Sequence, residues 1–202
     1  FTLPKAIFLD TTFLTTLPKI ELDSEIAEVY KHSIIGDADL WNYLKVNPKK
    51  IDLDYIVQSS KDLKLEIVSK DPYEKNIRKK LNFGHTIGHA IESYLLDSNA
   101  PTLHGFAIAK GMIIESFIAK KENLLSEDYF HEIKTVLSNK FKSYLNFIID
   151  SKSIIKLMLS DKKNTQNTIN FSLPIKIGEV TINHELELKK VESYLLEFFK
   201  ND

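Results

Sequence analysis

Three histidines surrounded by glycines are the residues of this chain that are best suited to chemistry. His85, His89 and His104 are half of the six histidines, and residues 84–111 hold four of the six glycines. Two histidines four residues apart share one face of a helix, so both imidazoles can point at one metal ion. Glycine costs a helix about 1 kcal/mol relative to alanine, which favours a role in close approach of a backbone or ligand. The pattern predicts a metal site; a tightly packed core helix with two hydrogen-bonded histidines is the alternative.

Charged residues near these histidines could bind an anion or complete the metal site. Arg78 lies four residues before Asn82, on the same side of a predicted helix, and a guanidinium binds a phosphate or carboxylate through two parallel hydrogen bonds. The neighbouring lysines, 79 and 80, are interpreted as a solvated face. Glu28 lies mid-helix among apolar residues, where a carboxylate must be paired or bound to a cation. An ion pair with Lys31, three residues on, is the simpler alternative.

The apolar periodicity predicts a mainly α, helical bundle-like domain with one small β-hairpin. Residues 6–10 read as a buried strand, and residues 103–124 as a helix that is apolar nearly all round and therefore central. Alternating residues at 168–173 and 175–182 predict the hairpin. Further helices are expected at 24–36, 37–47, 51–68, 75–96, 126–145, 150–159 and 184–199.

The composition excludes several classes of protein. The 202 residues suffice for one domain with a sizeable core, and 43% of them are hydrophobic. A net charge of −1 gives no indication of a nucleic-acid or membrane partner. No apolar run approaches the ~20 residues that cross a bilayer. The absence of cysteine excludes disulfides and thiolate chemistry and is compatible with a cytoplasmic protein.

Several motifs resemble those of the 3-dehydroquinate synthases, in the same order and along nearly the whole chain. The segment from Asn82 to Glu92 resembles the signature of that family, and Leu103-His104-Gly105 its second histidine motif. Matching segments also occur at residues 14–18, 27–31, 161–163 and 173–178.

The resemblance implies a specific set of site residues. The metal, zinc or cobalt, is held by Glu28, His85 and His104, which leaves His89 beside the metal as a proton-handling group. Glu92 is then a residue that supports the ligands or a surface residue. The implied substrate-contacting and catalytic residues are His89, Asn82, Lys31, Arg78, Lys64 and Lys162. The implied NAD contacts are Phe13, Leu14, Thr15 and Thr16, although a strand-to-helix connector explains this segment equally well.

The resemblance also implies a function and a domain organisation. The family converts 3-deoxy-D-arabino-heptulosonate 7-phosphate to 3-dehydroquinate with loss of phosphate, a lyase reaction of the shikimate pathway for aromatic amino acid biosynthesis. We therefore expect residues 1–18 to be the end strand and connector of a missing N-terminal NAD-binding domain, and residues 19–202 to be the helical metal- and substrate-binding domain. Such a fragment is expected to be inactive alone, and the family is often a homodimer.

One residue departs from the family pattern, and two other functions compete. Phe106 stands where the family usually has a glutamate, which would alter the surroundings of the metal or mark a subfamily. The first competing function is another sugar-phosphate cyclase or a metal-dependent alcohol dehydrogenase. The second is a non-catalytic helical interaction domain, in which Glu28, His85 and His104 would lie apart.

Overall fold

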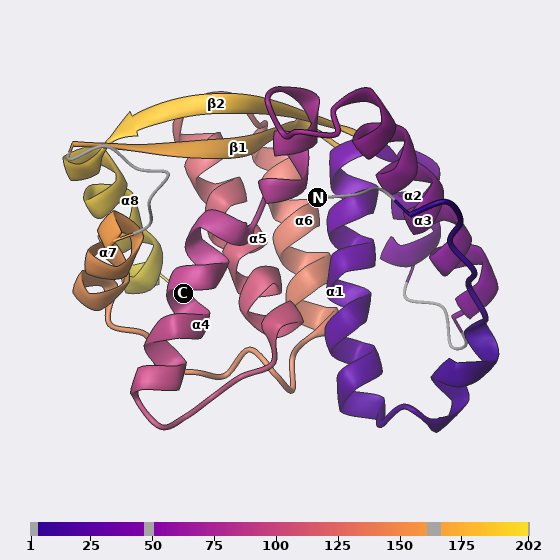
Figure 1. Ribbon diagram of the computed structural model, residues 1–202. Helices are drawn as coiled ribbons and strands as arrows, with labels where there is room; N and C mark the ends of the chain where they lie inside the picture. Colours follow the sequence, from indigo (N-terminus) through magenta and orange to yellow (C-terminus); the bar gives the residue numbers. More distant parts are fainter. Residues whose placement is uncertain (1–3, 47–50, 161–166, 202) are drawn as a thin grey trace.

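A helical body with one hairpin across its end makes up the computed structural model, which describes residues 4–46, 51–160 and 167–201 (Figure 1). The helices are α1 (Lys19–Gly36), α2 (Ala38–Lys45), α3 (Leu53–Lys70), α4 (His85–Asp97), α5 (His104–Lys121), α6 (Glu127–Lys140), α7 (Ser151–Ser160) and α8 (Leu188–Asn201). Two 3₁₀ helices, η1 (Thr11–Thr16) and η2 (Ile77–Asn82), and two strands, β1 (Thr168–Lys176) and β2 (Glu179–Glu187), complete it. The mainly α fold with one hairpin is confirmed.

Helix α5 is the central element, as its apolar sequence predicts. Every residue from Gly105 to Ala119 is buried. Helices α4, α1 and α6 pack around it, and α8 and β1 also contact it. A helix that is apolar on all sides is stable only when other elements cover all of them, so α5 holds the body together.

Glycines let α1 and α4 approach α5 at backbone distance. A Cβ added at Gly105 would lie 1.8 Å from the carbonyl oxygen of Ser24 in α1. One added at Gly111 would lie 2.1 Å from the carbonyl oxygen of Gly84, at the start of α4. Gly84 itself has φ 81°, a left-handed conformation that glycine adopts without strain. These contacts hold α1 and the start of α4 against α5, and the three helices carry Glu28, His85 and His104.

The hairpin lies across one end of the helices, from α8 to the region of α1 and α2 (Figure 1). Its strands pair antiparallel from Thr168 opposite Glu187 to Lys176 opposite Glu179. Gly178, at φ 85°, makes the turn, and its N–H donates to the carbonyl of Ile34 at 2.8 Å. This bond anchors the turn to the end of α1.

Helix starts follow the capping residues in the sequence. Asp37, Asp52 and Ser126 accept hydrogen bonds from the backbone N–H groups of Leu40, Tyr55 and Tyr129. Each side chain satisfies an N–H group that the first turn of a helix leaves unpaired.

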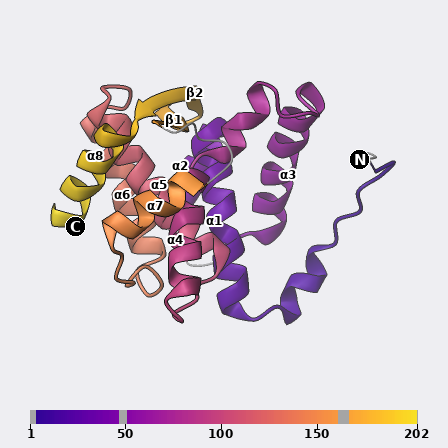
Figure 2. The same ribbon diagram turned by 60° about the vertical axis from the view of Figure 1, so that its left-hand side comes forward.

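Four local predictions differ from the structure. Residues 4–10 form no strand and are exposed, because no neighbouring strand lies beside them in the described chain (Figure 2). The hairpin turns at Gly178 rather than at Pro174, and α8 begins at Leu188, so His184 is in a strand. Residues 77–82 are a 3₁₀ helix. Among the described residues no helix is long and apolar enough to cross a membrane.

Candidate metal centre and adjoining cavity

Glu28 and His104 each lie close to His85, although the three residues come from three different helices. Glu28 is in the middle of α1, while His85 and His104 are the first residues of α4 and α5. The Nε2 atom of His85 lies 3.6 Å from Oε1 of Glu28. The ring centroids of His85 and His104 are 5.6 Å apart. The middle of α1 and the starts of α4 and α5 therefore place a carboxylate and a second imidazole beside the ring of His85.

Hydrogen bonds orient both imidazoles with Nε2 available for a ligand. Nδ1 of His85 bonds to the carbonyl oxygen of Phe83 at 3.1 Å. Nδ1 of His104 lies 3.0 Å from Oε2 of Glu92, one helix away. A metal-binding histidine commonly donates its second N–H to a carbonyl or carboxylate, which fixes its tautomer and ring orientation. Glu92 therefore has the position of a residue that supports a metal ligand.

The carboxylate of Glu28 has one occupied and one unoccupied oxygen. Oε2 accepts from Lys31 Nζ at 2.5 Å, the ion pair that the three-residue spacing allows. Oε1 is buried, has no hydrogen-bond partner among the residues that the structure describes, and lies 3.6 Å from Nε2 of His85. A buried carboxylate oxygen without a partner is costly. Ligand atoms at about 2.1 Å from a tetrahedral zinc ion are about 3.4 Å apart, so the 3.6 Å separation fits a shared divalent cation.

His89 adds a third imidazole to the same cluster. The nearest ring nitrogens of His85, His89 and His104 all lie within 4.8 Å of one another. The ring of His89 is 5.1 Å from that of His85 and is exposed to solvent. The cluster thus offers two ligand sets, with either Glu28 or His89 beside His85 and His104. The buried oxygen of Glu28 favours the first set and leaves His89 at the solvent side.

Burial and neighbouring charges determine the ionisation of these groups. Burial, together with the ammonium of Lys31, lowers the pKa of His85 to about 3, so the ring is neutral. Burial acts to raise the pKa of Glu28, but Lys31 and His85 outweigh it and the pKa falls below its usual value. Burial lowers the pKa of Lys31, which the carboxylate of Glu28 opposes. A neutral imidazole and an ionised carboxylate are the forms that bind metal ions.

Glu115 is a buried acid that the sequence reading missed. It is completely buried in α5, and its two oxygens accept from the N–H groups of Gly84 at 2.6 Å and Ile87 at 3.0 Å. Burial raises its pKa to about 8, while the N–H groups of Ile87, Gly84 and Thr86 act in the opposite direction. Glu115 therefore caps the start of α4 from the neighbouring helix and fixes the position of His85. The signal available in the sequence was an acidic residue within an apolar helix, six residues before that helix ends at Lys121.

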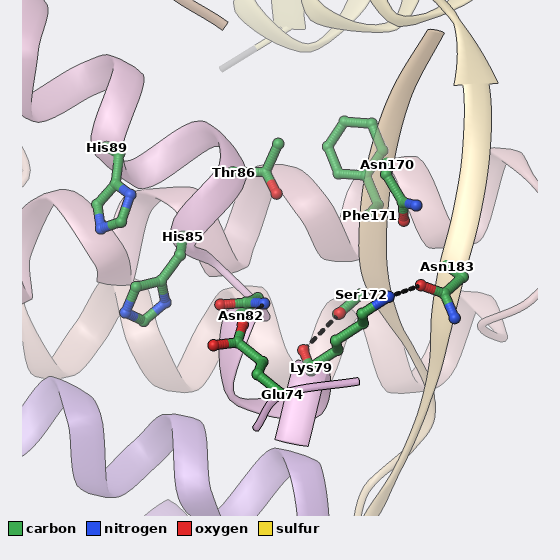
Figure 3. A pocket seen from close by; sticks show the side chains of 10 residues that line it. All are labelled: Glu74, Lys79, Asn82, His85, Thr86, His89, Asn170, Phe171, Ser172 and Asn183. Carbon is green, nitrogen blue, oxygen red and sulfur yellow. Dashed lines mark hydrogen bonds between the residues drawn. The ribbon is translucent and has the colours of Figure 1, made fainter. Parts of the chain in front are cut away.

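A cavity of about 430 Å³ opens beside His85 and His89 (Figure 3). Asn82 and Thr86 line it next to the histidines. The hairpin forms the opposite wall, with Lys79 of η2 between the two sides. The lining residues that the sequence reading gave no role are Glu74, Lys79, Thr86, Asn170, Phe171, Ser172 and Asn183. They come from segments about a hundred residues apart, and no local pattern brings them together.

The other predicted site residues lie around this centre with different partners. The guanidinium of Arg78 donates to the carbonyl of Pro72 at 2.7 Å, and Asn82 donates to Glu74 at 2.9 Å. Lys64, in α3, is exposed, and its charge adds to the lowering of the pKa of Lys31 that burial causes. Lys162 lies outside the described residues.

Arg78 and Asn82 do not share the side of an α-helix that their spacing predicts. Residues four apart in a 3₁₀ helix, with three residues per turn, point about 120° apart. The carboxylate of Asp71 accepts from the N–H groups of Lys75, Asn76 and Arg78, which shapes the chain leading into η2. Gly84 then separates η2 from α4.

The predicted NAD contacts lie on η1, beside the start of α3. Phe13 is strongly exposed, and Thr15 lines a second cavity with Thr11, Thr12 and the residues from Ile51 to Asp54. Phe13, Leu14, Thr15 and Thr16 form one short 3₁₀ segment, and Thr16 is exposed.

Phe106 belongs to the core rather than to the metal centre. It is buried, and its ring stacks on Tyr144 with centroids 4.2 Å apart and planes 8° apart. The hydroxyl of Tyr144 donates to Asp23 at 2.9 Å. The carboxylate beside His104 is that of Glu92, so replacement of the usual glutamate by Phe106 leaves His104 with a carboxylate partner.

Comparison with known proteins identifies relatives by sequence. Residues 25–164 match the family model described as 3-dehydroquinate synthase C-terminal. The chain is 37% identical over 199 residues to the 3-dehydroquinate synthase of Thermodesulfovibrio yellowstonii, which covers 93% of this chain and 55% of that protein. It is 38% identical over 185 residues to that of Caldanaerobacter subterraneus subsp. tengcongensis, covering 89% and 51%. The chain thus spans about half the length of these curated relatives.

Solved structures share the fold at lower sequence identity. A 2-epi-5-epi-valiolone synthase from Streptomyces hygroscopicus, with NAD⁺ and Zn²⁺ bound, superposes with a TM-score of 0.74 at 20% identity and covers 96% of this chain and 55% of that one. A 2-deoxy-scyllo-inosose synthase with carbaglucose-6-phosphate, NAD⁺ and Co²⁺ gives 0.76 at 23% identity, covering 93% and 55%. These similarities establish the sugar-phosphate cyclase fold.

Proposed function

The chain belongs to the 3-dehydroquinate synthase C-terminal family, and we propose that it is the metal- and substrate-binding part of such a synthase. The observation that carries this proposal is the proximity of His85 to both Glu28 and His104, which come from other helices, together with a buried oxygen of Glu28 that has no hydrogen-bond partner among the described residues. The whole enzyme would convert 3-deoxy-D-arabino-heptulosonate 7-phosphate to 3-dehydroquinate in the cytoplasm, as a homodimer.

Two bound groups would supply the chemistry that side chains lack. When bound, a zinc or cobalt ion would polarise a substrate hydroxyl, and NAD would accept and return a hydride. The solved neighbours were obtained with NAD⁺ and with Zn²⁺ or Co²⁺. Glu28, His85 and His104 would hold the ion. Phe13 to Thr16 would contact NAD that is bound mainly by an N-terminal domain, whose end strand and connector would be residues 1–18.

The remaining residues would orient the substrate and move protons. His89 is exposed on the cavity side of the cluster, where its imidazole can exchange protons with a bound hydroxyl and with water. Asn82 can hold a water or hydroxyl by its amide. The cations of Lys31, Lys64, Arg78 and Lys162 would neutralise the carboxylate and phosphate. Arg78 would have to leave the carbonyl of Pro72 to do so.

Metal titration of single variants tests the proposal. We expect Co²⁺, followed by its visible absorption and by calorimetry, to bind the wild-type chain, and His104→Ala to weaken binding at least about tenfold because one ligand is lost. Glu92→Gln should weaken it about tenfold or more by loosening His104. His131→Ala is the matched control, since His131 is exposed and pairs with Glu127 on the surface. Equal affinity of the wild type and His104→Ala for Co²⁺ would contradict the proposed catalytic function.

Turnover provides a second measurement. Since about half of each relative's length lies outside the match, we expect the 202-residue chain to bind metal weakly without synthase activity. Activity of the chain alone would contradict this. Assays of the full-length protein on different sugar phosphates separate a dehydroquinate synthase from other sugar-phosphate cyclases.

A further inference from the structure

The cavity beside the histidines has a second, polar wall that the proposed function does not use. Asn170, Phe171 and Ser172 from β1 and Asn183 from β2 face the histidine side across the cavity (Figure 3). Lys79, from η2, lies between the two sides. A volume of about 430 Å³ is within the range of small-molecule sites, so one compact ligand can touch both walls.

The ammonium of Lys79 is directed to the hairpin, and its partner there among the described residues is neutral. Its Nζ donates to Oδ1 of Asn183 at 2.7 Å. The hydroxyl of Ser172 donates to the carbonyl of Lys79 at 2.7 Å and so fixes its backbone. The ion pairs formed by the described residues do not include Lys79. An ammonium has three N–H donors, so two of them are available for a ligand without breaking the bond to Asn183.

The acidic residue of the cavity is held at the other end. Glu74 accepts from Asn82 at 2.9 Å, and Figure 3 shows its carboxylate beside Asn82, on the side of His85. The hairpin end therefore combines one cation with the amide of Asn183. Arg78, the cation next to Lys79 in the sequence, is turned to the carbonyl of Pro72 and does not line this cavity.

We propose that Lys79 and Asn183 form an anion subsite, which binds a carboxylate or phosphate group of a small polyhydroxy ligand whose other end meets His85 and His89. This proposal rests on the proposed function in one respect only: the proposed function says which end of the ligand reacts. Charge-assisted hydrogen bonds from an ammonium are about twice as strong as neutral ones, so Lys79 contributes most of the affinity. The amide of Asn183 keeps the ammonium at the hairpin wall.

Titration with inorganic phosphate and, separately, with acetate tests the subsite. The full chain is used with EDTA present, so the result does not depend on the metal centre. Side-chain amide signals in ¹H–¹⁵N spectra report the position of binding. We expect saturable shifts of the Asn183 amide, and Lys79→Gln should weaken binding at least about tenfold because the charge is lost. Lys80→Gln is the matched control, since this lysine is on the same 3₁₀ helix and does not line the cavity.

Two further measurements separate an anion site from a tether between η2 and the hairpin. Asn183→Gly suits the left-handed backbone at φ 55° and removes only the amide, so it should weaken anion binding while the chain stays folded. Thermal unfolding of each variant, followed by the fluorescence of buried Trp41, reports folding. Stronger binding of phosphate than acetate assigns the subsite to a phosphoryl group, and the reverse to a carboxyl group. Equal affinity in wild type and folded Lys79→Gln, or no saturable shift at Asn183 with either anion, overturns the proposal.

Discussion

At the scale of single residues, Glu115 has the largest influence on the geometry of the metal centre without lying in it. Its carboxyl group occupies the positive end of α4, where unpaired N–H groups and the helix dipole favour an acceptor. His85 is the residue between Gly84 and Thr86, so the cap and the metal ligand share one turn of backbone. A change at Glu115 must therefore reach the ring of His85.

The first prediction concerns the pH dependence of Glu115→Gln. The pKa of Glu115 is raised to about 8 from 4.5, so its protonated form stabilises the fold fully below pH 4.5, and this contribution is lost as the pH rises to 8. Glutamine has one acceptor oxygen, which leaves one N–H group unpaired at a cost of about 1–3 kcal/mol. We expect the destabilisation by Glu115→Gln to be largest near pH 5 and to shrink towards pH 8.

Urea unfolding at several pH values measures this difference. Glu122→Gln is a comparison at an acid whose pKa is lowered: burial acts to raise it, and Lys190 and Tyr194 outweigh that effect. Its penalty should instead be larger at neutral pH than near pH 4. A destabilisation by Glu115→Gln that grows with pH would show that the buried carboxyl is ionised.

Residue types and spacing predicted part of the site. The ion pair of Glu28 with Lys31 and the family assignment agree with the findings, while the roles assigned to the site residues stay predictions. Glu115 and the hairpin residues were missed for a physical reason. Their meaning depends on which helix start or histidine they face, and only long-range packing determines that.

At the scale of elements, the contact between α4 and α5 sets the distance between His85 and His104. Gly111 faces backbone atoms of Gly84 and Gly88, so a methyl group there meets atoms that a side-chain rotation does not move. Gly36 faces the end of the Leu63 side chain, which can rotate away. Substitution of these two glycines by alanine should therefore change the stability of the fold by very different amounts.

The second prediction compares Gly111→Ala with Gly36→Ala. Alanine at residue 111 should destabilise the fold by about 3 kcal/mol or more, because the helices must separate, and should weaken Co²⁺ binding as His85 moves away from His104. Alanine at residue 36 should change the stability by less than about 1 kcal/mol, since the gain in helix propensity offsets the shift of Leu63. Unfolding followed by Trp41 fluorescence measures both. Equal stability of the two variants would contradict the close contact.

The elements were predicted where periodicity is clear, as for α2 and α5, but α1 begins at Lys19 rather than at the predicted residue 24, and no side chain caps its start. Prediction failed where tertiary contacts decide the backbone. The carboxylate of Asp71 accepts hydrogen bonds from backbone N–H groups before and within residues 77–82, and the left-handed Gly84 follows them. Residues 77–82 therefore form a 3₁₀ helix, in which Arg78 and Asn82 point in different directions. The strand predicted at residues 6–10 has no neighbouring strand in the described chain, so a hydrophobic run alone did not specify a sheet.

At the scale of the whole molecule, stability should be concentrated in α5. All its residues from Gly105 to Ala119 are buried, whereas α3, which is equally long at 18 residues, buries only Ile56 and Ile67. The segment from Pro4 to Asp10 is exposed throughout. Amide hydrogens exchange through local opening where few contacts oppose it, so the two helices should differ strongly.

The third prediction is an order of hydrogen exchange. We expect the amides of α5 to exchange most slowly, those of α3 faster and those of residues 4–10 fastest, as measured by exchange and mass spectrometry of the full chain. Addition of Co²⁺ should slow exchange at the starts of α4 and α5 more than in α6, because the ion joins the first two. Exchange of α5 as fast as that of α3 would contradict a central role for this helix.

Helix α5 has two roles, one in folding and one at the candidate ion site, and this limits how such a protein can change during evolution. One buried helix supplies an imidazole to the candidate ion site and the acid that seats its neighbour, so inherited changes there threaten folding and metal affinity together. The hairpin also packs Ile169, Phe171 and Leu173 into the core, but the cavity residues Lys79 and Asn183 are partly or fully exposed at its rim. New ligand preferences are therefore more accessible to evolution at the rim, while the ion stays where it is.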